Sequence, residues 1–245
     1  MRRTFVLLLV AGTTSLRSYG SVSFFDDFNQ SSLSSTGWSV STEVAGSSVA
    51  LENGYVQLVN AGTIVRDVDF SSPVKIISRF QLSNNERSNL KYVLRSDGTK
   101  YFSERKGVAV QLSCRTDWNG YVNQLAIFEL GNTSLETPGP VISNSVEFTT
   151  PLNLNTWYNL QIIDYSDRIE VFFADSLTPI TLSTTYSVGS KLSIYNRHGA
   201  ADGSSISEGG TARLDFISIV PEPSSLSLLL AGGAVLMAGR RRSRG

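Results

Sequence analysis

The chain has 245 residues, with 21 Lys and Arg, 21 Asp and Glu, and a single cysteine. Seven of the basic residues and one of the acidic residues lie in two end segments, so the interior has 14 basic and 20 acidic side chains and a net charge near −6. Phosphate binding requires clustered cations, so we do not expect nucleic acid as a partner. The single Cys114 excludes a disulfide within the chain, and we expect it to be a small buried residue beside Leu112.

Residues 1–23 have the layout of a secretory signal peptide. Met1-Arg2-Arg3 precedes an apolar stretch from Phe5 to Gly12, and small residues follow up to Ser23. We therefore predict export by the Sec machinery and cleavage by signal peptidase near Gly20 or Ser23. The pair Arg2-Arg3 leaves twin-arginine export as the alternative.

Residues 24–219 are enough for one large β domain with its own core. Apolar residues alternate with polar ones along much of this stretch, which is the period of a half-buried strand. The inward positions that we expect are Val74, Ile76, Phe80 and Leu82, then Val108, Val110 and Leu112, and then the pairs Leu125 and Ile127, Leu160 and Ile162, Val171 and Phe173, Leu192 and Ile194, and Leu214 and Phe216. The spacing of these strands is typical of an antiparallel sandwich.

Turn residues separate the predicted strands. The clearest turn segments are Glu52-Asn53-Gly54, Ser96-Asp97-Gly98-Thr99, Asn119-Gly120, Pro138-Gly139-Pro140 and the hairpin turn Asp164 to Arg168. Asp164, Asp167 and Glu170 are accordingly expected to be solvated acids around a turn. The long segment from Arg197 to Gly210 is predicted to be a binding loop or a sheet edge.

Several segments of the core resemble the concanavalin A-like, or laminin-G-like, jelly roll. They are Phe24-Phe25-Asp26-Asp27-Phe28 before Gly37-Trp38, Leu51 to Leu58, Trp157 to Ile162 leading into Ile169 to Phe173, and Ala212 to Ile219. The resemblance implies an all-β fold with two antiparallel sheets, one of them concave, and with the first and last strands side by side. Members of this fold bind or cleave carbohydrates or act as adhesive domains, so the fold alone fixes no activity.

The sequence offers no catalytic constellation. The Glu-x-Asp-x-x-Glu string of the laminarinase branch of this fold does not occur, although glycosidases require two placed carboxyl groups. His198 is the single histidine, and no Gly-x-Ser-x-Gly turn accompanies it. We predict a noncatalytic domain, with a glycoside-active hydrolase of the same fold as the alternative.

Two ligand sites are predicted instead. Trp118, Asn119 and Tyr121 combine aromatic rings with an amide at a turn, which suits a glycan. Trp38 and Trp157 are expected in the core. Asp27 and Asp215 would approach one another if the terminal strands pair, so they are the candidate ligands of a calcium ion.

The last 26 residues, 220–245, contain three different pieces in a fixed order. Val220, Pro221, Glu222 and Pro223 come first and are expected outside any sheet, because proline cannot donate a backbone hydrogen bond. An uncharged run from Ser224 to Gly239 follows, and as a helix it would extend about 24 Å, slightly less than a bilayer core. A basic cluster of Arg240, Arg241, Arg242 and Arg244 ends the chain and is expected to stay on the cytoplasmic side.

This order resembles the PEP-CTERM sorting signal of Gram-negative bacteria, with Val220 to Pro223 as its motif. The resemblance implies that an exosortase-type membrane protease removes the tail. An ordinary C-terminal membrane anchor, which would keep its transmembrane helix, is the alternative. The predicted organisation is a signal peptide at 1–23, a jelly-roll domain at 24–219 and a sorting signal at 220–245. The predicted protein is anchored briefly in the inner membrane and then reaches the envelope, surface or extracellular matrix, where it binds polysaccharide or has a structural role.

Overall fold

The computed structural model describes residues 24–42, 46–83, 87–98, 106–117, 120–131, 142–150, 152–196 and 210–221. Within these ranges the side chains of 87–88, 114–117, 120–123 and 142–143 are not described. The elements are β1 (Phe24–Asp26), the short 3-10 helix η1 (Leu33–Thr36), β2 (Ser39–Thr42), β3 (Ser48–Glu52), β4 (Tyr55–Val59), β5 (Gly62–Asp67), β6 (Val74–Ser83), β7 (Arg87–Ser96), β8 (Gly107–Asp117), β9 (Gly120–Leu130), β10 (Ile142–Thr149), β11 (Trp157–Asp164), β12 (Arg168–Phe173), β13 (Ile180–Ser183), β14 (Lys191–Asn196) and β15 (Thr211–Pro221).

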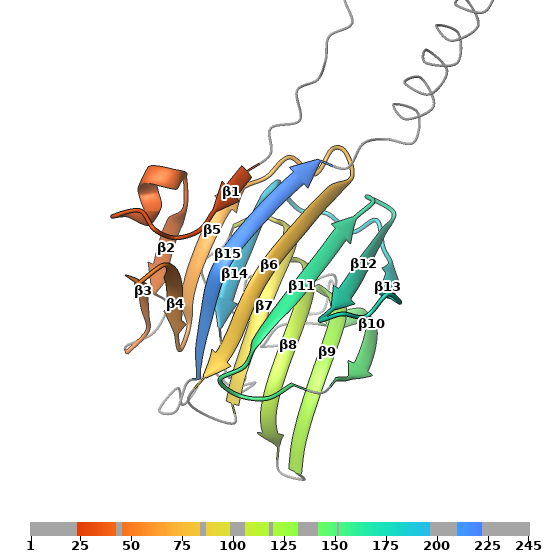
Figure 1. Cartoon of the computed structure of the whole chain (residues 1–245). Coiled ribbons are helices and arrows are strands. Elements are labelled where there is room, and N and C mark those ends of the chain that lie inside the picture. The colour runs from red at the N-terminus through yellow and green to blue at the C-terminus, as the bar shows by residue number, and fades with distance from the viewer. Residues whose placement is uncertain are drawn as a thin grey trace, which may run out of the picture.

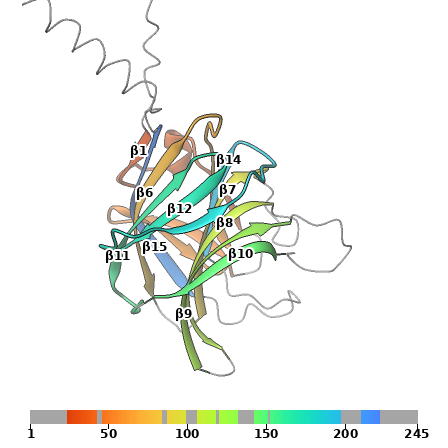
Figure 2. The ribbon, with the colours of Figure 1, turned by 90° about the vertical axis from the view of Figure 1, so that its right-hand side faces the viewer.

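The strands form two antiparallel sheets. Sheet A has the order β13-β12-β11-β6-β15-β4-β3, with β1 added on β15, and sheet B has the order β10-β9-β8-β7-β14-β5-β2. Figure 1 shows β15, β6 and β11 in front of β14, β7 and β8. In Figure 2, β11 and β12 belong to one layer and β8 and β10 to the other. The protein is therefore an antiparallel β-sandwich, as the sequence predicted.

The core lies between the two sheets and is formed by the predicted inward positions. In β6 the side chains of Val74, Ile76, Phe80 and Leu82 are at most 2% exposed, while the intervening Arg79 points outward. The inward residues predicted for β8, β9, β11, β12 and β14 are all buried in the same cluster. Burial of one side of each strand stabilises the sandwich by about 25 cal/mol for each Å² of apolar surface removed from water.

The predicted turns join neighbouring strands. Asn53 and Gly54 connect β3 to β4 with φ angles of 45° and 83°, which is the left-handed backbone of a two-residue hairpin turn. The segment 164–168 connects β11 to β12, and the backbone N–H of Tyr165 donates to the carbonyl oxygen of Arg168 over 2.9 Å. These two hairpins confirm the sequence prediction.

A β-bulge in β15 changes the direction of one predicted core residue. Leu214 is paired with Phe80 and points into the core, but the register shifts before Phe216, which is paired with the outward Arg79. Phe216 therefore lies on the outer face of sheet A, where its ring stacks on Phe25 with centroids 6.0 Å apart. A bulge inserts one residue into the alternation, so a prediction based on strict period two is wrong for Phe216.

The first and last strands lie side by side, as the resemblance implied. Phe24, Phe25 and Asp26 of β1 are paired with Ile219, Ser218 and Ile217 of β15 (Figure 1). The strand β15 also continues through Val220 to Pro221, which is paired with Val74 of β6.

The expectation that Val220 and Pro221 stand outside any sheet is therefore wrong. Proline is tolerated here because Pro221 is the last residue of its strand. The rest of the tail, including Glu222, Pro223, the apolar run and the arginine cluster, lies outside the described residues, as does the predicted signal peptide. Among the described residues there is no helix that is long and apolar enough to cross a membrane.

Trp38 is a core residue, as predicted, and it holds a buried carboxylate. Its side chain is 2% exposed, and its Nε1–H donates to Oδ2 of Asp26 over 2.9 Å. The hydroxyl of Thr36 donates to the same oxygen over 2.8 Å, and the backbone N–H of Phe28 donates to Oδ1 over 2.8 Å. Buried polar groups require such partners, so this arrangement fixes the chain after β1 against the core.

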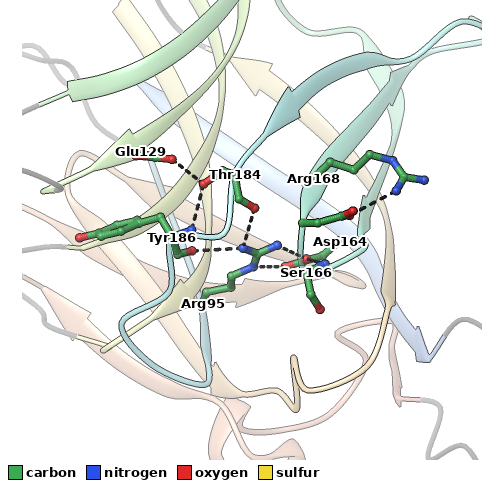
Figure 3. A network of polar contacts seen from close by, with 8 residues as sticks. Arg95, Glu129, Asp164, Ser166, Arg168, Thr184 and Tyr186 are labelled. Atoms are coloured by element: carbon green, nitrogen blue, oxygen red, sulfur yellow. Dashed lines mark hydrogen bonds and ion pairs between the residues drawn. The ribbon is translucent and has the colours of Figure 1, made fainter.

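A buried ion pair joins the two sheets at one end (Figure 3). Arg95 of β7 donates from Nε to Oδ2 of Asp164, the last residue of β11, over 2.8 Å, and from Nη2 to Oδ1. Its Nη1 donates to the carbonyl oxygens of Thr184 and Tyr186, each over 3.2 Å. The Arg95 and Asp164 side chains are 3% and 2% exposed, so the prediction of a solvated Asp164 is wrong.

The other two acids around this turn, Asp167 and Glu170, lie at the surface, which is closer to the predicted exposure to solvent. Asp167 has a side chain that is 69% exposed, and Glu170 is 18% exposed and accepts a hydrogen bond from Nε of Arg168 over 2.9 Å. The three carboxylates therefore do not form one group. Asp164 belongs to the packing between the sheets, while Asp167 and Glu170 belong to the surface.

Candidate functional site

One row of polar and aromatic side chains crosses the outer face of sheet A. The register places Gln57 of β4 beside Arg213 of β15, Arg213 beside Gln81 of β6, and Gln81 beside Trp157 of β11. Their neighbours along each strand, such as Leu58, point into the core. Side chains alternate across a strand, so all four members of the row point outward.

A chain of hydrogen bonds orients the polar side chains of this row. Arg213 donates from Nε to Oε1 of Gln57 over 3.0 Å and from Nη1 to Oε1 of Gln81 over 3.1 Å. The amide of Gln57 donates in turn to Oε1 of Glu52 over 3.3 Å, and the amide of Gln81 donates to the carbonyl oxygen of Asn155 over 3.0 Å. Each amide uses its nitrogen and its oxygen in opposite directions, which holds the guanidinium in one position between them.

Two aromatic rings accompany the row. Tyr55 and Trp157 meet edge to face with their centroids 6.5 Å apart, and both are partly exposed. The guanidinium carbon of Arg213 lies 5.3 Å from the centroid of Tyr55, and that of Arg79 lies 5.4 Å from the centroid of Trp157. Cations at this distance are attracted to the face of the ring, which limits the movement of both partners. We call Tyr55, Gln57, Arg79, Gln81, Trp157 and Arg213 the platform.

An open groove continues the platform across sheet A. It has a volume of about 720 Å³ and lies over β6, β11 and β12. Asn159 on its floor is the cross-strand neighbour of Arg79, so the groove begins next to the platform. Its lining combines amides with apolar side chains, and Leu177 is 93% exposed. The residues that line it are Ile77, Asn159, Leu160, Gln161, Phe172, Ala174, Asp175, Ser176 and Leu177.

The outer face of sheet B differs in its accessibility. Val93, Ala109, Phe128 and Tyr195 belong to a second apolar cluster on this face and are at most 3% exposed. Lys91 of the same face is also buried, as is Gln81 of the platform, but Tyr55, Gln57, Trp157 and Arg213 of the platform are partly exposed. A polymer needs exposed rings and polar groups, so among the described surfaces the platform is the better candidate site.

The glycan site predicted at Trp118, Asn119 and Tyr121 is not described. Trp118 and Asn119 lie outside the described residues, and Tyr121 is described only as a backbone position of β9. Asp117 is paired with Gly120, so this segment is the connection between β8 and β9. His198 and the loop 197–209 also lie outside the described residues, and the Cys114 side chain is not described.

The assignment of Trp157 to the core is wrong. Leu160 and Ile162 point inward, so the alternation places Tyr158 inward and Trp157 outward. Strand parity could have identified Trp157 from the sequence. Arg213 was also missed, although its neighbours Ala212 and Leu214 are apolar and its own position is polar.

The two predicted calcium ligands have other partners. Asp215 accepts from Nη1 of Arg79 over 2.9 Å, and Oδ1 of Asp27 accepts from the backbone N–H of Asn29 over 3.3 Å. Hydrogen bonds from Asn29 lower the pKa of Asp27. Within the described residues no three His, Cys, Asp or Glu side chains form a group that could hold a metal ion. Asp215 is thus paired with Arg79 and Asp27 with its own turn, and a calcium site at these two residues stays a prediction.

Comparison with known proteins supports the architecture. No family model and no curated protein matches the chain. Among solved structures, a β-glucanase from Bacillus licheniformis is 10% identical with a TM-score of 0.58, and the match covers 82% of this chain and 98% of that one. An endo-β-1,3-glucanase from Pyrococcus furiosus is 11% identical with a TM-score of 0.55, and the match covers 81% and 93% of the two chains.

A third solved structure is the exoplasmic/lumenal domain of VIP36 in its Ca²⁺/Man3GlcNAc-bound form. It is 11% identical with a TM-score of 0.57, and the match covers 83% of this chain and 89% of that one. Identities this low define the fold and no more. The described domain is thus a concanavalin A-like jelly roll, a class in which function depends on the residues that the two sheets present.

Proposed function

We propose that the protein is an exported, noncatalytic carbohydrate-binding protein whose ligand lies on the platform. The observation that carries this proposal is the fixed row of amides and guanidinium beside the partly exposed rings of Tyr55 and Trp157. A sugar ring has a flat apolar face that packs on an aromatic ring, and its hydroxyl groups need fixed hydrogen-bonding partners. The solved structures with this fold include two glucanases and a glycan-bound lumenal domain, which agrees with a carbohydrate ligand.

The carboxylate of Glu52, which lies beside the platform, has a role in orienting its neighbours that favours binding over hydrolysis. Glu52 accepts hydrogen bonds from two platform residues, from the Tyr55 hydroxyl over 3.1 Å and from the Gln57 amide. Glu52 is thereby committed to orienting its neighbours. A glycoside-active hydrolase remains the alternative, and the experiment below distinguishes it from a noncatalytic binding protein.

Export and sorting form the second part of the proposal. The signal peptide at 1–23 directs the chain to the Sec machinery and signal peptidase, and the tail at 220–245 directs it to an exosortase-type protease. The pairing of β1 with β15 supports this proposal, because it places Phe24 and Pro221, the first and last described residues, at one end of the domain (Figure 1). Processing would then release the domain to the envelope, surface or extracellular matrix. Since Val220 and Pro221 belong to β15, we expect cleavage beyond Pro221.

The test is affinity electrophoresis of the full-length protein through gels that contain one polysaccharide each, with reducing sugar measured in parallel mixtures. We expect retarded migration in at least one gel and no release of sugar. Trp157→Ala should weaken the binding about tenfold, because it removes a stacking surface. The matched control is Phe148→Ala, since Phe148 is 58% exposed on β10 of the other sheet. Release of reducing sugar would establish the hydrolase instead, and the absence of any retardation would contradict the proposal.

The proposed binding of carbohydrate does not require calcium. The same gels run with calcium and with chelator should give equal retardation, because Asp215 is already paired with Arg79. A calcium-dependent retardation that Asp27→Asn abolishes would restore the predicted site at Asp27 and Asp215.

A further inference from the structure

Arg213 differs from most of the other described arginines, because no carboxylate among the described residues is paired with it. Five arginines have described side chains, and three of them, Arg79, Arg95 and Arg168, are paired with carboxylates. Arg66 donates to the carbonyl oxygen of Thr36 and lies over the ring of Phe24. Arg213 has the neutral amide oxygens of two glutamines as its hydrogen-bond acceptors within the described residues.

The two glutamines use only part of the donor capacity of Arg213. A guanidinium has five N–H donors, and the amides of Gln57 and Gln81 accept two of them. These two amides leave both N–H groups of Nη2 and one of Nη1 to other acceptors. Among the described residues no carboxylate is paired with this positive charge, although the residue is only partly exposed. A carboxylate that accepts two parallel N–H bonds fits this arrangement better than a neutral hydroxyl group does.

We infer that the platform binds an acidic glycan, with the carboxylate of a hexuronate on Arg213 and the sugar ring against Tyr55 or Trp157. The inference rests on the proposed carbohydrate-binding function and adds the ligand class. A hexuronate has an apolar ring face and a carboxylate on the same unit. On the platform, the Arg213 guanidinium lies 5.3 Å from the Tyr55 ring, and Tyr55 lies 6.5 Å from Trp157, so both groups of one sugar unit have partners close together.

The charge of the whole domain gives this inference a specific salt dependence. The interior of the chain has a net charge near −6, so a polyanion is repelled at long range. Salt screens that repulsion, while a direct contact at a partly buried guanidinium is screened much less. Binding of an acidic glycan should therefore persist or strengthen as salt is raised, in contrast to nonspecific binding by clustered cations.

The experiment compares polygalacturonate with carboxyl-reduced polygalacturonate, which has the same backbone without the carboxylates. Affinity electrophoresis of the full-length wild-type protein should show retardation by the first polymer and at least about tenfold weaker retardation by the second. Arg213→Met keeps the aliphatic stem and removes the donors, so it should weaken binding of polygalacturonate by a similar factor. Arg168→Met is the matched control, because Arg168 is a surface arginine with carboxylate partners on the same sheet.

A second variant should change the affinity for polygalacturonate in the opposite direction. Its result does not depend on whether Arg213→Met folds. Glu52→Gln removes the negative charge next to Gln57 and keeps an oxygen that can accept from Tyr55. It should strengthen binding of polygalacturonate relative to binding of the carboxyl-reduced polymer, because only the first polymer has carboxylates that Glu52 repels. Equal binding of the two polymers by the wild-type protein, with no effect of Glu52→Gln, would overturn the acidic ligand and leave the carbohydrate-binding function intact. Failure of every polysaccharide to bind would overturn both.

Discussion

Replacing Asp164 by asparagine removes one charge of the ion pair that joins the two sheets and leaves the shape almost unchanged. Arg95 then stays buried, with a side chain that is 3% exposed, next to a neutral amide and the carbonyl oxygens of Thr184 and Tyr186. Removal of one partner from a buried pair costs about 3–5 kcal/mol, because the other charge is left without compensation in a medium of low polarity. A domain is stable by only about 5–15 kcal/mol, so Asp164→Asn should lower the unfolding transition markedly.

The assay is unfolding by urea, followed by intrinsic tryptophan fluorescence. The control is Asp167→Asn in the same turn, since the Asp167 side chain is 69% exposed and its pair with Arg168 should contribute at most about 1 kcal/mol. The double variant Arg95→Met with Asp164→Leu removes both charges. Its loss in free energy of unfolding should be smaller than the sum of the losses for Arg95→Met alone and Asp164→Leu alone. A loss below about 1 kcal/mol for Asp164→Asn, or strict additivity in the double variant, would refute the assignment of a buried charge pair.

Three further variants test the core. Trp38→Phe removes the donor to Asp26 and should lower the free energy of unfolding by about 2–3 kcal/mol, whereas loss of less than 1 kcal/mol would contradict the buried hydrogen bond. Gly62→Ala should destabilise by about 1–3 kcal/mol in the same urea assay, because a Cβ there would lie 2.2 Å from the carbonyl oxygen of Ser48; a neutral effect would argue against this close approach. Burial raises the pKa of the Tyr92 hydroxyl. Above about pH 10 this hydroxyl therefore loses its proton in the unfolded state and keeps it in the folded state. The free energy of unfolding of the wild-type protein should then fall with rising pH more steeply than that of Tyr92→Phe. Parallel stability curves of these two proteins between about pH 9 and pH 11 would show that Tyr92 does not titrate on unfolding.

Local alternation was sufficient to predict seven of the fifteen strands that the structure describes, namely β6, β8, β9, β11, β12, β14 and β15. Val74, Ile76, Phe80 and Leu82 identify β6 because a buried strand face must be apolar at every second position, and β6 indeed has its inward residues in that order. Asn53 and Gly54 identify the β3–β4 turn because few residues adopt positive φ. These features depend on neighbours in the chain, so a single sequence contains the information.

The errors occur where a residue depends on a distant partner or on a local irregularity. Asp164 was assigned to solvent because its own segment is polar, but its partner Arg95 is 69 residues away in the other sheet. Phe216 was assigned to the core because nothing in the local pattern announces the bulge. The platform requires the register of four strands, which places Gln57, Arg213 and Gln81 in one row, and the sequence alone does not provide that register.

The strand β15 also sets the reach of the binding site. It contains Arg213 near its beginning and Pro221 at its end, and the eight steps between them span about 27 Å at the rise of an extended strand. Under the proposed sorting, the sheet acts as a rigid spacer that holds the platform about three nanometres beyond the point where the tail leaves the domain. The platform could then bind a polymer outside the membrane before the protease removes the tail. The protein would thus bind its ligand while the tail still anchors it in the membrane.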